Sequence, residues 1–318
     1  MRLIGSIKAF TIVILFLAAG WQPATAQETA KAEGNGNAVL WEPVDIPSRN
    51  LLLGPTSEGI APALEKVTFL GRQAGGNNLK YRLKDANGRE WVVKIADESR
   101  AEVAAVRLLW AIGYRTEIDQ IVKRLNIEKI GSYKNARFEA RPETRKRGER
   151  WSWANNPFIG TREFNGLKLM MAFVNNWDLK DENNLIFEED GKNYYIVSDL
   201  GSSFGKLADK SYSRSGRSVS KPEDFYRSGF IKGVENGVLV LDYRGAGEDW
   251  LKGIPVEHGR WLADLLLQLK DEQIADAFRA ANYSPEEVSL LTAAVKERIA
   301  ILDRATKTET AAKSNGAD

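Results

Sequence analysis

The chain of 318 residues contains 45 Lys and Arg, 43 Asp and Glu, one His and no Cys. The lack of cysteine excludes disulfides and thiolate metal sites, and a single histidine excludes a metal site built from several imidazoles. The formal charge of +2 does not indicate a nucleic-acid-binding surface. The length and the hydrophobic content of 43% are enough for one large domain or two lobes with cores.

The first 26 residues are typical of a secretory signal peptide. Arg2 and Lys8 precede an apolar run at residues 9–20, and small residues lead to Ala26. A membrane-spanning helix needs roughly 20 apolar residues, so cleavage after Ala26 is favoured over a membrane anchor. Cleavage removes two basic residues and no acidic one, which leaves 43 of each. We therefore expect an exported protein, periplasmic or secreted, without a membrane span after cleavage.

An antiparallel β-rich segment is predicted after a flexible leader at residues 27–38, whose small polar residues are typical of disorder. Asn87 and Gly88 form a hairpin signal between two runs of β-forming residues. A helix is expected over residues 99–112, because apolar residues recur there at helical spacing. The expected strands cover residues 66–71, 78–83, 90–95, 118–130 and 136–140.

The second half is predicted to be mainly helical. The basic, loop-like residues 141–150 indicate a boundary between an N-lobe at 39–145 and a C-lobe at 146–303. A tail rich in Thr, Ala and Lys at residues 304–318 is expected to be disordered. Helices are expected at residues 163–173, 256–269, 270–282 and 284–303, and a strand pair at 184–187 and 194–198.

Acidic and amide side chains follow one another in a fixed order in this half. Asp178 and Asn183 are five residues apart with Lys180 between them, and Asp199 comes directly after a strand-like run. Phosphoryl transfer needs a carboxylate that orients the attacking hydroxyl, oxygen ligands for a divalent metal, and a cation near the phosphates. Solvated loops are also rich in Asp and Asn, which is the simpler interpretation of either motif alone. Together, and in this order, the motifs favour phosphoryl transfer.

The two motifs resemble those of the protein-kinase-like superfamily. NNWDLKDENNLIF is similar to its catalytic loop, and YYIVSDLGSSFG is similar to the strand and metal-binding turn that follow. The resemblance implies an α+β, two-lobed fold with an antiparallel β-rich N-lobe and a mainly helical C-lobe. It implies ATP or another nucleotide, with Mg or Mn. It also makes Asp178 the hydroxyl-orienting base, Lys180 a contact to the transferred phosphate, and Asn183 and Asp199 metal ligands.

Lys94 ends a predicted strand, as does the kinase lysine that contacts the nucleotide phosphates. Glu102, at the start of the next helix, resembles the glutamate that pairs with this lysine. Ser99 and Glu102 also fit a helix capping box, and Glu98 is the other candidate partner of the lysine.

A phosphate-covering loop would have to lie at Gly71, Gly75 and Gly76, between the first two strands. Glycines there would allow the backbone to approach a phosphate closely. A plain hairpin loop explains these glycines equally well.

The sequence also departs from ordinary protein kinases. Leu200 replaces the phenylalanine of the metal-binding turn, and no His-Arg pair precedes Asp178. The segments look more like those of HipA-type kinases, phosphatidylinositol kinases and secretory-pathway casein kinases. The acceptor hydroxyl therefore stays open among protein, lipid and small molecule. A catalytically inactive kinase-like binding or scaffold protein is the alternative.

Two further features are interpreted as structural. His258 at a helix entry has no second histidine to act with. The basic residues 145–150 with Trp151 and Trp153 could bind RNA or an acidic substrate, but a solvated segment with two packed tryptophans is favoured. No nucleic-acid partner is expected.

Overall fold

The computed structural model describes residues 37–55, 60–74, 78–209 and 216–315, with side chains up to residue 307. These residues belong to one compact unit, residues 32–318. The expected signal peptide and the leader up to residue 36 lie outside the described residues. Within the described ranges, no helix has both the length and the apolar character to cross a bilayer.

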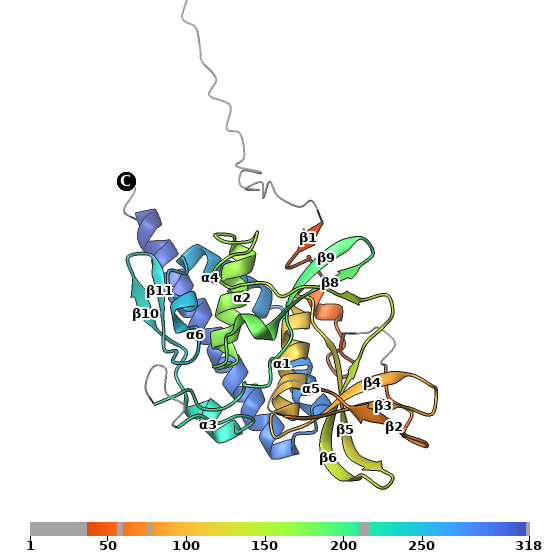
Figure 1. Ribbon diagram of the computed structural model, residues 1–318. Coiled ribbons are helices and arrows are strands. Elements are labelled where there is room, and N and C mark those ends of the chain that lie inside the picture. Colours follow the sequence, from red (N-terminus) through yellow and green to blue (C-terminus); the bar gives the residue numbers. More distant parts are fainter. Residues whose placement is uncertain (1–36, 56–59, 75–77, 210–215, 316–318) are drawn as a thin grey trace, which may run out of the picture. The chain divides into compact units, whose positions relative to one another are not determined.

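A five-stranded antiparallel sheet forms the N-terminal half, in the order β2-β3-β4-β6-β5 (Figure 1). Tyr81 and Leu83 of β3 point inward and pack with Trp91 and Phe138 on neighbouring strands, because alternate side chains of a strand share a face. Gly88 has a φ of 81° in the turn between β3 and β4, as its sequence predicts. The strands are β2 (Thr68–Arg72), β3 (Leu79–Lys84), β4 (Glu90–Ile95), β5 (Ile118–Ile127) and β6 (Gly131–Ala140).

Helix α1 (Ser99–Ala111) follows β4 and packs against β5 and β6 on one side and α5 on another. The expected capping box is wrong. Glu98, not Ser99, is the N-cap residue, and Ser99 Oγ donates to the carbonyl of Lys94 at 3.3 Å. The carboxylate of Glu102 is therefore directed at cations rather than at the helix terminus.

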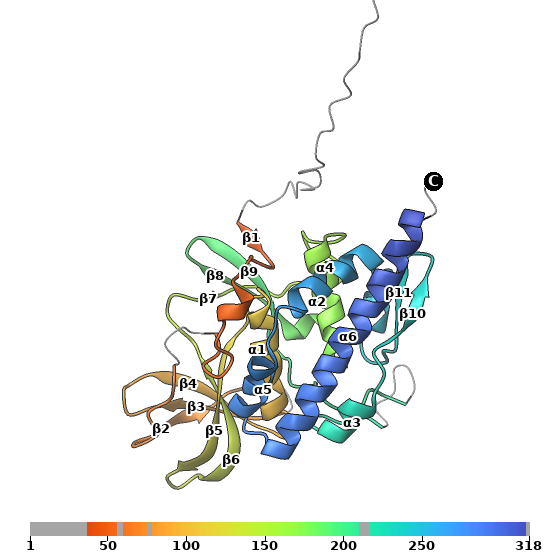
Figure 2. The same cartoon turned by 180° about the vertical axis from the view of Figure 1, so that it is seen from behind.

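The C-terminal half is mainly helical. Thr161 caps α2 through a bond from the amide of Phe164 to Thr161 Oγ1 at 3.2 Å. The long helix α6 packs against α3, α4 and α5 (Figure 2). The helices are α2 (Arg162–Phe173), α3 (Pro222–Arg227), α4 (Val256–Leu266), α5 (Asp271–Ala280) and α6 (Pro285–Asn315), with short 3-10 helices η1 (Ile46–Ser48), η2 (Asp181–Asn183) and η3 (Glu248–Leu251).

Helix α6 continues to Asn315, past residue 304, where the sequence predicted a disordered tail to begin. Thr306 is fully buried, and Arg260 of α4 donates to Asp303 at 2.7 Å and to Thr306 at 3.2 Å. These contacts attach the last turns with described side chains to the body. A composition rich in Ala, Lys and Thr does not reveal them.

Short strands connect the two halves. Ala38 already pairs with Asn193 in β9, although the sequence predicted a flexible leader to residue 38. Lys146 and Arg147 form β7, within the segment predicted to be a loop. The second sheet has the order β1-β9-β8-β7, and a hairpin of β10 and β11 was not predicted. Bounds are β1 (Ala38–Val39), β7 (Lys146–Arg147), β8 (Asn184–Glu189), β9 (Lys192–Val197), β10 (Ile231–Glu235) and β11 (Val238–Leu241).

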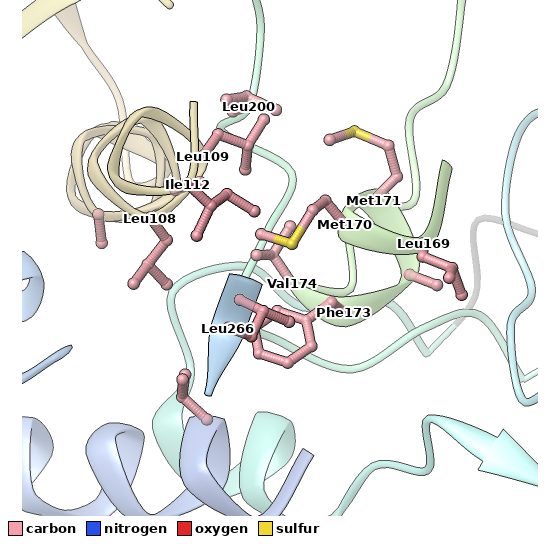
Figure 3. Packing of buried hydrophobic residues seen from close by; sticks show 14 of the residues in the cluster. Leu108, Leu109, Ile112, Leu169, Met170, Met171, Phe173, Val174, Leu200 and Leu266 are labelled. Atoms are coloured by element: carbon pink, nitrogen blue, oxygen red, sulfur yellow. The ribbon is translucent and has the colours of Figure 1, made fainter. Parts of the chain in front are cut away.

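The main core lies between α1, α2 and the C-terminal helices. Leu108 and Leu109 of α1, Met170 of α2 and Leu266 of α4 all belong to it (Figure 3). Leu200, which follows Asp199, is fully buried in the same cluster. The prediction of an α+β fold with an antiparallel N-terminal half and a mainly helical C-terminal half is confirmed.

Arg298 of α6 ties the end of α2 to the rest of the C-terminal half. Its side chain is buried and donates to the carbonyls of Ala172 at 3.1 Å and Phe173 at 3.0 Å. It also donates to Asn175 Oδ1 at 3.0 Å and to Ser228 Oγ at 2.8 Å. The backbone that leads from α2 into the Asp178 loop is thereby fixed.

We predict that Arg298→Met lowers the free energy of unfolding by at least about 3 kcal/mol, because several buried acceptors lose their donor. Urea unfolding measures this change. Lys296→Met, on an exposed face of the same helix, should change it by less than about 0.5 kcal/mol. Equal effects of the two substitutions would contradict the role of Arg298.

Candidate functional site

Lys94 is a buried cation surrounded by three carboxylates. Its Nζ lies 3.0 Å from Glu102 and 3.4 Å from Asp199, and it also pairs with Glu98. Both glutamates considered from the sequence thus contact the lysine. The carboxylates raise the pKa of Lys94 against the lowering effect of burial, so the side chain stays charged.

The structure links the two sequence motifs through backbone hydrogen bonds. The carbonyl of Asn183 accepts from the amides of Ser198 at 2.7 Å and Asp199 at 3.4 Å. Asn183 Nδ2 in turn donates to the carbonyl of Asp178 at 2.7 Å and to its Oδ2 at 3.3 Å. Lys94, Asp199, Asn183 and Asp178 are therefore connected in one continuous series of contacts.

Lys180 lies beside the candidate base, with its Nζ 2.6 Å from Asp178 Oδ1. The exposed fraction of its side chain is 46%, against 21% for Asp178. A cation that is half exposed and held beside a carboxylate can reach a phosphate that approaches from solvent.

Two oxygen atoms of the site are of the type that binds a divalent cation. Asp199 Oδ1 accepts from Lys94 and, at 3.2 Å, from the amide of Gly201. Among the described residues no donor is found for Asp199 Oδ2 or for Asn183 Oδ1, because the amide group of Asn183 is turned toward Asp178. Carboxylate and amide oxygens are the ligands that Mg²⁺ prefers. Burial alone would raise the pKa of Asp199, but the charges of Lys94 and Arg137 lower it, which keeps the carboxylate ionised.

A second acidic group, Glu98, Glu102 and Asp199, has oxygens close enough to share a metal. The ammonium of Lys94 contacts all three of these carboxylates. The lysine thus supplies the positive charge that this group needs in the described structure.

Arg137 extends the charged site into the sheet. This buried guanidinium of β6 lies 2.7 Å from Glu102, 3.2 Å from Asp119 and 3.4 Å from Glu117. Glu117 also accepts from Ser198 Oγ at 2.7 Å, directly before Asp199. Sequence reasoning missed Arg137, because a charged residue within a predicted strand indicates a solvent-facing side.

Asn176 is the second residue that sequence reasoning did not assign. Its Oδ1 accepts from the amide of Asp178 at 3.1 Å, and its Nδ2 donates to the carbonyl of Asp199 at 3.5 Å. The carbonyl of Asn176 accepts from Tyr243 at 2.6 Å. Asn176 therefore positions both acidic motifs at once, and its place directly before Trp177 and Asp178 was the available signal.

The predicted glycine loop is only partly described. Gly71 has a φ of 148° at a β-bulge in β2, and no atom of the described residues lies within 4 Å of a Cβ built there. Gly75 and Gly76 lie outside the described residues.

The features interpreted as structural are packed. Trp151 and Trp153 are buried, and Trp151 Nε1 donates to the carbonyl of Ile196 at 2.8 Å. His258 Nδ1 lies 2.8 Å from Asn165 Nδ2 in α2. Buried indoles offer no stacking surface for RNA.

The ion-paired network holds more carboxylates than cations. Six carboxylates share four cations among the described residues, so the negative charge of this network is not fully compensated. Burial raises the pKa of Glu102 to about 8 and that of Asp119 to about 7, against the opposing charge of Arg137. The carboxylates are Glu98, Glu102, Glu117, Asp119, Glu139 and Asp199, and the cations are Lys94, Arg137, Arg141 and Arg147.

We predict that the protein loses stability as the pH rises from 6 to 9. A carboxyl whose pKa is raised by folding stabilises the folded state at low pH, and this contribution is lost as the pH rises through its folded pKa. Urea unfolding at both pH values should show a smaller loss for Glu102→Gln than for the unchanged protein. Glu128→Gln, at an exposed turn, should keep the original loss, and an unaltered pH dependence in Glu102→Gln would contradict the prediction.

No protein-family model and no curated protein matches the chain. Among solved structures, the proinflammatory kinase CtkA of Helicobacter pylori is similar, with a TM-score of 0.49 and 8% identity. The match covers 78% of this chain and 99% of that chain. A similarity at this TM-score does not assign functional residues or a substrate. The residue roles are therefore argued from the geometry of the site itself.

Proposed function

We propose that the chain is an exported, kinase-like phosphotransferase that uses ATP or another nucleotide together with Mg or Mn. One observation carries the proposal: Lys94 contacts both Glu102 and Asp199, and Asp199 is joined through Asn183 to Asp178. Kinases need this set of a strand lysine, a helix glutamate, a metal-binding aspartate and a loop aspartate with its asparagine.

The order of elements supports the same proposal. Lys94 lies on the third strand of the sheet, and Glu102 lies on the helix that follows it. Asp178 and Asn183 precede the β8–β9 hairpin, and Asp199 comes directly after it. This is the order in which kinases present their lysine, glutamate, catalytic loop and metal-binding turn.

Each residue has a chemical task in this proposal. Lys94 binds the donor phosphates, and Glu102 holds its ammonium in place. Asp178 accepts a hydrogen bond from the acceptor hydroxyl and takes its proton as the oxygen attacks. Lys180 neutralises charge on the transferred group. Asn183 and Asp199 would hold the metal, which supplies charge neutralisation at the phosphates when bound.

The identity of the donor nucleotide has to be determined by experiment, because it depends on the compartment. An exported protein meets little ATP, so ATP and GTP are both tested, each with Mg and with Mn. The inactive binding or scaffold protein is the alternative, and it predicts no phosphoryl transfer.

We predict that nucleotide and metal together stabilise the purified protein. At a hundredfold excess over Kd, one bound ligand adds about 2.7 kcal/mol to the free energy of unfolding. Asp199→Asn should abolish the metal-dependent part of the thermal shift, since it removes the ionised ligand. Asp190→Asn, in the exposed β8–β9 turn, is the matched control and should keep the full shift. No shift with any nucleotide and metal pair would contradict the proposal.

We further predict that Asp178→Asn lowers the rate of phosphoryl transfer from a γ-labelled nucleotide by at least about 100-fold. Its thermal shift with nucleotide and metal should stay, because Asp178 acts on the acceptor. A transfer rate that Asp178→Asn leaves unchanged would remove Asp178 from the mechanism. Nucleotide binding with no transfer to any acceptor would favour the scaffold alternative.

A further inference from the structure

A cavity of about 880 Å³ opens beside the candidate site. Ile95 and Ala96, which follow Lys94, form one wall, and Trp177, which precedes Asp178, forms another. Its volume is in the range of small-molecule and cofactor sites. Lys94, Asn183 and Asp199 do not line it, so the cavity is distinct from the place assigned to the donor phosphates and metal.

The cavity is rich in positive charge. Lys134 of β6, Arg217 and Lys221 line it, together with Arg100 of α1. Arg100 is neutralised by Glu287 at 2.8 Å. Within the described ranges, no carboxylate lies at ion-pair distance from Lys134, Arg217 or Lys221. Asp97 is the acidic residue of the lining, so the cations are in excess.

Arg217 is held in place beside the candidate base. Its guanidinium carbon lies 4.5 Å from the centre of the Trp177 ring, and Trp177 Nε1 donates to the carbonyl of Ser218 at 3.3 Å. Ser218 Oγ donates in turn to Asp224 of α3 at 2.6 Å. Among the described residues, no hydrogen-bond partner is found for the buried Arg217 Nε. A guanidinium held in place over a ring is suited to a carboxylate or phosphate.

We infer that this cavity binds an anionic group of the acceptor, a carboxylate or a phosphate, next to the hydroxyl that receives the phosphoryl group. The inference rests on the proposed function, because it names the class of acceptor. Trp177 connects the two places: it lines the cavity, and the next residue is Asp178. An anion there neutralises cations that form no ion pair with a carboxylate in the described structure. A neutral or basic acceptor would leave them unpaired.

The test compares acceptors that differ only in charge. A fluorescein-labelled peptide with serine flanked by glutamates should bind at least about tenfold more tightly than the same peptide with lysines, in fluorescence anisotropy at low salt. A sugar phosphate, added as competitor, distinguishes a small-molecule anion from a peptide. Charge-dependent binding of the acidic peptide, or its displacement by the sugar phosphate, supports the inference. Binding of neither the acidic peptide nor the sugar phosphate overturns it.

Charge reversal assigns the binding to this cavity. The double variant Lys134→Glu with Lys221→Glu should weaken binding of the anionic probe at least about tenfold. Both side chains are exposed, so the fold should be kept, as an unchanged melting temperature would verify. Lys129→Glu, at the turn of the same β5–β6 hairpin but outside the lining, is the matched control and should bind as the unchanged protein does.

Failure of this inference differs from failure of the proposed function. Equal affinity for the acidic and basic peptides, or full affinity in the double variant, overturns the anionic acceptor even where nucleotide and metal still give their thermal shift. Loss of the thermal shift alone counts against phosphoryl transfer. Charge-dependent peptide binding in that case would still support an anion site in the cavity.

Discussion

The rest of the site depends on the ion pairs that the ammonium of Lys94 forms with three carboxylates. A buried cation is unfavourable without partners, and here Glu98, Glu102 and Asp199 come from a helix N-terminus, the helix itself and a distant turn. These partners fix α1 against β4 and draw the Asp199 turn to the sheet. One side chain therefore joins the β-rich half to the loops of the helical half.

Arg137 extends this charge network from Glu102 to further carboxylates of the sheet. Its contacts to Glu102, Glu117 and Asp119 place a buried guanidinium behind the lysine, and Ser198 connects Glu117 to the turn before Asp199. Removing one member would leave an unpaired buried charge, which is more costly than the pair is stabilising. This buried charge network therefore fixes the position of the Lys94 ammonium more than it raises the free energy of unfolding. Asn176 fixes the geometry of the Asp178 loop in a similar way, through hydrogen bonds to Asp178 and Asp199 instead of ion pairs.

The sequence predicted the parts of the fold that depend on local patterns. The hairpin at Gly88, helix α1 and the strands around Gly191 follow from turn residues and periodicity. The parts that depend on distant contacts were not predicted: Ala38 in β1 and the last turns of α6 beside Arg260. Nothing in a short polar segment reveals a partner far along the chain. The β10–β11 hairpin was also missed, although Asn236 and Gly237 at its turn are a local signal.

The candidate site divides in the same way. Lys94, Asp178, Asn183 and Asp199 were recognisable because spacing and order carry their signal, and the structure connects them. Arg137 and Asp119 were not recognisable, because charged residues in strands look like a solvent-facing side. Both are in fact buried. Glu102 was predicted as the partner of Lys94, with a helix cap as the alternative, and the three-dimensional contact with Lys94 decides between the two.

The central claim is that Lys94 and Asp199 serve one nucleotide and its metal. Calorimetric titration of Mg–ATP, or of the nucleotide that gives the larger thermal shift, into Lys94→Met, Asp199→Asn and the double variant tests it most directly. The account predicts that each single substitution weakens binding at least about tenfold and that the double variant loses less than the sum of the two free-energy changes, because both residues act on the same phosphates. Unchanged affinity in Lys94→Met would contradict it.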